Sequence, residues 1–206
     1  MKVILINGSP NAKGCTYTAL TEVEKTLNEE KIETEIIHVG HKDIRGCIGC
    51  RKCSTTGKCV FNDIVNEIAP KLAECDGIVI GSPVYYASAN GTVVSFLDRL
   101  FYSTSSCDKT MKVGAAVVSA RRAGTTATFD ELNKYFTISN MPIVSSQYWN
   151  MVHGYTPEDV YKDKEGCQIM RTLGKNMAFL IKSIDLGKEK YGLPEKEDHI
   201  FTSFLG

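Results

Sequence analysis

The chain has 206 residues, of which 43% are hydrophobic, and this size predicts a single domain over residues 1–206 with a full core. Its 24 basic residues balance 24 acidic ones, so no net charge favours nucleic acid or an anionic membrane as a partner. No apolar run is long enough to cross a bilayer and the N-terminus lacks the pattern of a signal peptide, so we expect a cytoplasmic protein.

The first eighteen residues predict a strand, a loop and a helix. Residues 2–7 form a short apolar run rich in β-branched side chains, which is typical of a buried parallel strand. Small and hydroxyl-bearing residues follow, and an apolar helical pattern then continues to Leu27. Such a loop presents backbone N–H groups and the positive end of a helix to a phosphate, and Lys13 is its only cation. It matches neither GxGxxG nor GxxxxGK[ST], and an ordinary capped turn is the alternative interpretation.

The rest of the chain alternates between predicted strands and helices. Further strands are expected at residues 32–39, 77–81, 112–118 and 141–144, and further helices at 62–74, 91–101, 128–135 and 157–186. The final residues, 192–206, read as irregular. Five strands that alternate with helices predict an α/β fold with a parallel, doubly wound sheet.

Three loops at the carboxyl ends of the predicted strands carry most of the Gly, Ser, Pro and Tyr clustering. They lie after the first, third and fourth strands, at residues 8–18, 82–91 and 119–126. Ligands of doubly wound sheets bind at this edge, so the clustering predicts a cofactor site. The alternatives are core packing for Tyr85 and Tyr86 and a solvated loop for the adjacent arginines that follow Ala120.

Three motifs in these segments are shared with a known family: Gly8-Ser9-Pro10-x-x-x-Gly14-x-Thr16, Ser82-Pro83-Val84-Tyr85-Tyr86 and Phe96-x-Asp98-Arg99. With them, the chain resembles the NAD(P)H-dependent FMN reductases of flavodoxin-like fold. The resemblance implies a three-layer sandwich whose five-stranded parallel sheet has the order 2-1-3-4-5, with helices on both faces. It also implies FMN as cofactor and NAD(P)H as co-substrate.

The resemblance further implies which residues contact FMN. The phosphate would be held by Ser9, Asn11, Gly14, Cys15 and Thr16, and the isoalloxazine ring surrounded by Pro83, Val84, Tyr85, Tyr86, Ser119, Ala120, Arg121 and Gly124. We expect Arg121, and not Arg122, to face the flavin edge. Many relatives have Arg at the position of Asn11, so Lys13 or backbone amides would carry the phosphate here, and FMN would bind more weakly. Asp98 and Arg99 are expected to be a structural or interface pair.

A cysteine-rich segment at residues 40–61 is too long for a simple turn and indicates a function. Cys47, Cys50, Cys53 and Cys59 have the spacing C-x2-C-x2-C-x5-C, and four such thiolates can wrap one tetrahedral ion or one cubane cluster. The spacing resembles the cluster motif of iron–sulfur flavoproteins, which would make a 4Fe-4S cluster a further cofactor. Zinc, reactive thiols and cysteines without any metal are the alternatives. Elsewhere, we expect Cys75 and Cys167 to be buried as small apolar residues.

Two functional classes follow from these interpretations. The first is an enzyme that passes electrons from NAD(P)H through FMN to a small acceptor, such as a flavin, quinone, nitro or azo compound. The second is an iron–sulfur flavoprotein or flavodoxin-like carrier that moves electrons between protein partners. The balanced charge favours the enzyme, because many flavodoxins that dock to partners are acidic. The resemblance also implies a homodimer or homotetramer, and the segment at residues 148–153, with the only tryptophan, is the expected interface or substrate lid.

Overall fold

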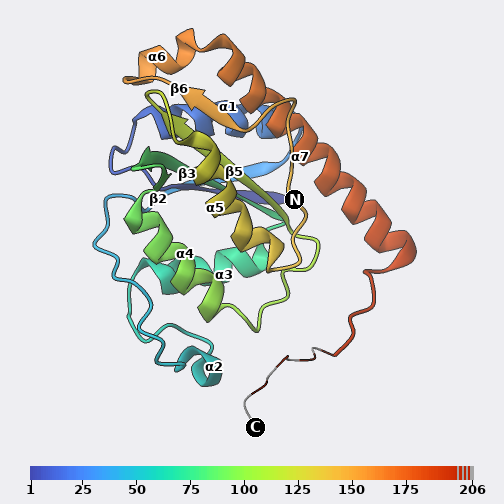
Figure 1. The fold of residues 1–206 in the computed structure, drawn as a ribbon. Coiled ribbons are helices and arrows are strands. Elements are labelled where there is room, and N and C mark those ends of the chain that lie inside the picture. The colour runs from blue at the N-terminus through green and yellow to red at the C-terminus, as the bar shows by residue number, and fades with distance from the viewer. Residues whose placement is uncertain (199, 201, 203, 205–206) are drawn as a thin grey trace.

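The computed structural model describes residues 1–198, 200, 202 and 204, and it shows a β-sheet between two layers of helices (Figure 1). The strands are β1 (Lys2–Asn7), β2 (Glu33–His38), β3 (Gly77–Tyr85), β4 (Ser88–Ala89), β5 (Val113–Ala120) and β6 (Met151–His153). They follow the order β2-β1-β3-β5-β6, all parallel, and β4 pairs antiparallel with the end of β3. Without β4 this is the predicted order 2-1-3-4-5, so the flavodoxin-like fold is confirmed with six strands instead of five.

The helices divide between the two faces of the sheet. They are α1 (Cys15–Glu29), α2 (Cys53–Thr56), α3 (Ile64–Glu74), α4 (Gly91–Ser103), α5 (Thr125–Thr137), α6 (Pro157–Lys162) and α7 (Lys164–Tyr191). One core cluster joins the sheet to α1, α6 and α7, and the other joins it to α3, α4 and α5 (Figure 1). Along β1, Ile4 and Ile6 enter one cluster while Val3 and Leu5 enter the other, as the alternation of a strand buried on both faces requires.

The predicted fifth strand at residues 141–144 is wrong in position. Only Ile143 forms a bridge there, with Gly114, and the strand itself is β6, whose Met151 pairs with Val118. From Ile143 to Met151 the edge segment advances by eight positions, whereas its partner β5 advances by only four, from Gly114 to Val118. The extra residues of the edge segment form a bulge. The Ser146 hydroxyl closes this bulge by donating to the Asn150 side chain at 2.8 Å.

The predicted single helix at residues 157–186 is also corrected, since it breaks at Asp163 and ends later, at Tyr191. The Asp163 carboxylate accepts from the backbone N–H of Gly166 at 2.9 Å, which starts α7, and from that of His153 at 2.7 Å. Residues 192–198 contain no helix or strand, as predicted for the C-terminal segment. Residues 199, 201, 203 and 205–206 lie outside the described residues. Among the described residues, no helix is long and apolar enough to cross a membrane.

Candidate functional site

The loop at residues 8–14 ends at the N-terminus of α1, where a phosphate can be bound. In the part of the chain that the structure describes, no side chain caps this helix at Gly14. An α-helix leaves its first four N–H groups without intrahelical partners, and its dipole makes this end positive. The uncapped first turn of α1 therefore suits the phosphate of FMN, bound through backbone N–H groups.

Side chains from neighbouring strands fix the shape of this loop. The Asn7 side chain donates to the Ala12 carbonyl at 3.1 Å and accepts from the Ser9 N–H at 3.1 Å. The Ser9 hydroxyl is buried and accepts from the Asn11 N–H at 3.2 Å. The His38 Nε2 atom lies 2.7 Å from the Ser9 carbonyl oxygen. The Ser9 side chain thus shapes the loop from within.

Gly40, at the start of the cysteine-rich segment, lies directly against the same loop. A Cβ atom at Gly40 would come within 2.2 Å of the Ser9 carbonyl oxygen and 2.3 Å of the Gly8 carbonyl oxygen. Only glycine permits this approach, so the cysteine-rich segment is anchored on the predicted phosphate loop.

The first and third loops are joined by two buried hydroxyls. Those of Thr16 and Ser119 are 2.8 Å apart, and both residues are less than 5% exposed. The hydroxyl of Thr16, which was predicted to contact the phosphate, therefore forms a hydrogen bond with the hydroxyl of Ser119. The Cys15 thiol donates to the Gly154 carbonyl at 3.6 Å, and burial raises the pKa of this thiol. Of the other predicted phosphate contacts, Asn11 and Lys13 are exposed.

The second loop is a tight hairpin between β3 and β4. Its two central residues, Tyr86 and Ala87, have φ values of 52° and 59°, which a type I′ turn requires but side chains disfavour. The Glu131 carboxylate of α5 holds the returning strand, accepting from the Ser88 hydroxyl and the Ala89 N–H at 2.8 Å each. Strained turns of this kind are concentrated at functional sites.

The third loop touches this hairpin at Gly124. Its φ is 90°, and a Cβ there would lie 2.8 Å from the Ala87 Cα. Tyr85 and Tyr86 are 47% and 105% exposed, so neither is a core residue, and the alternative interpretation of core packing is wrong. Pro83 and Val84 are half-buried, and Ser119 and Ala120 are buried, whereas Arg121 and Arg122 are both exposed. The structure therefore brings the three predicted loops together at one edge of the sheet.

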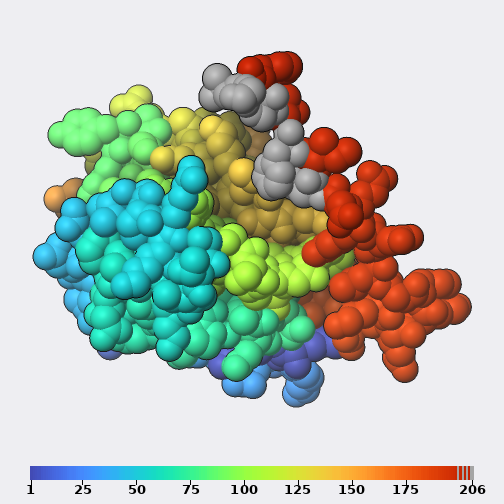
Figure 2. Space-filling view, turned by 90° about the horizontal axis from the view of Figure 1, so that it is seen from below, coloured from blue at the N-terminus to red at the C-terminus, as the bar shows by residue number. Residues whose placement is uncertain are grey.

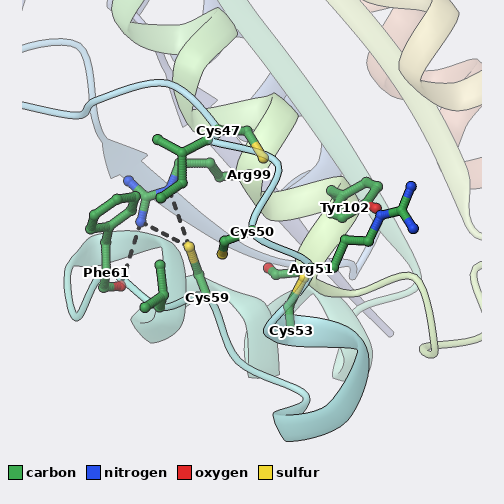
Figure 3. Close-up of a pocket in the computed structure, with 11 residues that line it drawn as sticks. Cys47, Cys50, Arg51, Cys53, Cys59, Phe61, Arg99 and Tyr102 are labelled. Atoms are coloured by element: carbon green, nitrogen blue, oxygen red, sulfur yellow. Dashed lines mark hydrogen bonds between the residues drawn. The ribbon is translucent and has the colours of Figure 1, made fainter.

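The cysteine-rich segment forms a separate pocket with α4. Cys47, Cys50, Cys53 and Cys59 all line it, and Figure 3 shows their side chains around a common space while Arg51 extends away. The segment lies on the outside of the molecule, as its cyan atoms show in Figure 2. Cys47 and Cys50 are exposed, whereas Cys53 and Cys59 are partly buried. The predicted group of four cysteines is therefore assembled around one pocket.

A buried arginine closes one side of this pocket. The Arg99 side chain is 1% exposed and donates to the Cys59 sulfur from Nε and Nη2, at 3.3 Å each. It also forms a forked ion pair with Asp63, at 2.7 and 2.8 Å. Burial lowers the pKa of Arg99, but the hydrogen bonds with Asp63 and Cys59 outweigh it and the pKa is raised, so the guanidinium stays charged. The neighbour of Arg99 in the sequence, Asp98, accepts a hydrogen bond from the Tyr135 hydroxyl at 2.6 Å, so both residues make structural contacts.

The donor set of the pocket consists of thiols, which suit a thiolate-bound iron–sulfur cluster. No group of three or more His, Cys, Asp or Glu among the described residues is arranged to hold one ion. Zinc bound at about 2.3 Å needs sulfurs only about 3.8 Å apart. A four-iron cluster takes one thiolate at each iron and so accommodates sulfurs that are farther apart. The described lining residues include four thiols and two arginines but no carboxylate or imidazole.

Comparison with known proteins identifies the family. The model of the NADPH-dependent FMN reductases matches residues 1–156. The chain belongs to this family. It is therefore an oxidoreductase of an FMN-binding family, and the expected resemblance is confirmed.

Two curated relatives and one solved structure refine the comparison. Both relatives are iron–sulfur flavoproteins of Methanocaldococcus jannaschii: one is 36% identical, over 89% of this chain and 99% of its own length, and the other 28%, over 94% and 100%. The structure of RosB with a bound 8-demethyl-8-formylriboflavin-5'-phosphate intermediate has a TM-score of 0.71 at 13% identity. It covers 100% of this chain and 92% of that one, and it shows that the fold is shared.

Several residues of the candidate sites were not found from the sequence. The hydrogen bond from Arg99 to the Cys59 sulfur connects residues that are 40 positions apart in the sequence. The hydrogen bond from the hairpin to Glu131 likewise connects residues more than 40 positions apart. His38 likewise reaches Ser9 from a neighbouring strand. Gly40 had a usable signal, since a glycine directly after a predicted strand indicates a close approach of two backbones.

Proposed function

We propose that this chain is an FMN-dependent oxidoreductase that also holds a 4Fe-4S cluster, with Cys47, Cys50, Cys53 and Cys59 as ligands. The observation that carries this proposal is the assembly of all four thiols around one pocket closed by a buried cation. The two relatives named as iron–sulfur flavoproteins support it, because they match this chain over nearly their whole length.

The two proposed cofactor sites have different chemistry. FMN takes up hydride at its N5 atom and can release the two electrons singly, whereas a cluster exchanges one electron at a time. The chain contributes the uncapped start of α1 for the phosphate, the strained hairpin for the ring, and four thiolates for the irons. Arg121 at the exposed third loop would stabilise negative charge on the reduced flavin.

One helix connects the two proposed sites. Helix α4 begins at Gly91, directly after the hairpin of the second loop, and its Arg99 and Tyr102 line the cysteine pocket. Eight residues of α-helix, from Gly91 to Arg99, rise about 12 Å. This closeness supports electron transfer between the proposed sites within one chain.

We propose NAD(P)H as the electron donor and a small molecule, such as a quinone or flavin, as the acceptor. The second candidate function is a reductase that works by hydride transfer on FMN alone, and the family match over residues 1–156 favours it. In that case the cysteine pocket would have no part in the reaction.

Reduction without oxygen separates these two functions. Protein prepared anaerobically would be titrated with NADPH and NADH while the visible absorption and the electron paramagnetic resonance spectrum are recorded. We expect the flavin absorption to bleach and a cluster signal to develop in the unaltered protein. A Cys50→Ala variant should lose the cluster signal, and a Cys107→Ala variant, altered outside the four-cysteine motif, should keep it. Flavin bleaching with no cluster signal in the unaltered protein would leave the hydride-only reductase.

A further inference from the structure

The four pocket cysteines are held very differently by the protein. The Asn66 side chain binds the backbone of Cys59 on both sides, accepting from its N–H at 2.9 Å and donating to its carbonyl at 3.0 Å. The Cys59 sulfur accepts two hydrogen bonds from Arg99. Among the described residues, no hydrogen bond to the sulfur of the other three pocket cysteines is found. Cys59 is therefore fixed before any metal binds, and the other thiols lie on a surface segment.

Arg99 is itself held rigidly by the fold. It extends from α4 and donates to the carbonyl groups of Arg45 and Phe61, at 3.3 and 3.4 Å, in addition to its fork with Asp63. The Asp63 carboxylate also accepts from the Val65 N–H at 3.1 Å, which caps α3. Two helices thus fix the guanidinium through its forked ion pair with Asp63.

We propose that Arg99 is a positioning residue that presents Cys59 as the anchoring ligand and raises the reduction potential of the cluster. This inference rests on the proposed function. Reduction adds one electron to the cluster, supplied by the reduced flavin, and forms or breaks no covalent bond. The added negative charge is shared with the ligand sulfurs, so N–H donors to Cys59 stabilise the reduced state more than the oxidised state. Because Arg99 is buried, these hydrogen bonds are weakly screened by water.

Substitutions at Arg99 test this role, with Arg51 as a matched control. Arg51 lines the same pocket, but in the described structure it makes no side-chain hydrogen bond to a cysteine sulfur. We expect Arg99→Gln to shift the ratio of reduced to oxidised cluster at least tenfold toward the oxidised form at a fixed potential, a decrease of about 59 mV for one electron. Arg99→Lys keeps the charge but loses the fork, and should cause a smaller decrease. Arg51→Gln should shift the ratio less than threefold.

A measurement on the unaltered protein keeps the test independent of folding in the variants. Chain labelled with 15N only in arginine would be reduced, and its electron spin echo modulation recorded. We expect a 15N coupling to the reduced cluster that persists in Arg51→Gln. Retained FMN binding would show that the Arg99 variants are folded.

The outcomes distinguish the inference from the proposed function. If the unaltered protein forms a cluster but shows no 15N coupling, or if folded Arg99 variants keep its potential, the role of Arg99 is overturned and the proposed function stands. If anaerobically prepared unaltered protein forms no cluster, both are overturned.

Discussion

Gly40 is the residue at which the cysteine-rich segment meets the predicted phosphate loop. We expect Gly40→Ala to lower the free energy of unfolding by at least about 3 kcal/mol, because its Cβ would overlap two backbone carbonyl oxygens that cannot move freely. Gly46→Ala is the matched control. The nearest atom to its Cβ would be the Ser95 hydroxyl at 3.9 Å, and the effect should stay within about 0.5 kcal/mol. Urea unfolding of both variants measures the difference, and equal stabilities would contradict the tight contact.

Cys75 gives a second prediction at the scale of a single residue. Burial raises the pKa of its thiol from 9.0 to about 11, so the folded chain holds this proton over a pH range in which the unfolded chain has lost it. The free energy of unfolding should therefore fall as pH rises from about 9 to 11, by about 2–3 kcal/mol from this group.

A Cys75→Ala variant isolates this contribution. It should be less stable at neutral pH because it leaves a cavity, but its stability should decline less steeply between pH 9 and 11. Parallel urea titrations across this range measure the two slopes. Identical slopes would show that the thiol does not titrate as proposed.

At the scale of elements, the hairpin of β3 and β4 depends on α5. The Glu131 carboxylate accepts hydrogen bonds from both the Ser88 hydroxyl and the Ala89 N–H. We expect Glu131→Ala to weaken FMN binding about tenfold and to lower stability by about 1–3 kcal/mol, since it frees a hairpin that already contains two left-handed residues. Glu131→Gln keeps an acceptor oxygen and should have a smaller effect. Fluorescence titration with FMN gives the dissociation constants, and unaltered affinity in Glu131→Ala would separate the hairpin from the flavin site.

Local signals in the sequence predicted most of the elements. Apolar runs predicted β1, β3 and β5, and an alternating pattern predicted β2. Asp63, at the start of the helix expected at residues 62–74, caps α3. The fifth strand was misplaced because the residues around Ile143 are apolar and typical of a strand. Ile143 forms only an isolated bridge, and regular pairing with β5 begins after the bulge, at Met151. The break at Asp163 was missed because the apolar helical spacing continues across it, although an Asp three residues before Gly166 is a capping signal.

The candidate sites were predicted as far as chain topology determines them. Parallel strands end at one edge, so the convergence of the three loops followed from the order of elements. The spacing of the cysteines likewise predicted their grouping. The contacts of Arg99 with Cys59 and of Thr16 with Ser119 could not be predicted, because they depend on the packing of helices that are distant in sequence.

At the scale of the whole molecule, the exposed aromatic side chains support assembly. Tyr148 and Trp149 are 55% and 51% exposed on the bulge before β6, which is an edge strand. We propose a homodimer or homotetramer that uses this edge, and we expect sedimentation at micromolar concentration to show more than one chain per particle. Trp149→Ala should shift the protein toward monomer, and Tyr161→Ala, an equally exposed aromatic on α6, should not. A monomeric unaltered protein would contradict this assembly.

The central claim is that FMN and a four-iron cluster occupy one chain, joined by α4. Its most direct test is the content of iron, acid-labile sulfide and FMN per chain in protein made and handled without oxygen. We predict about four irons, about four sulfides and one FMN, with the iron and sulfide lost in Cys50→Ala and the FMN retained. Less than one iron per chain in the unaltered protein would contradict the claim.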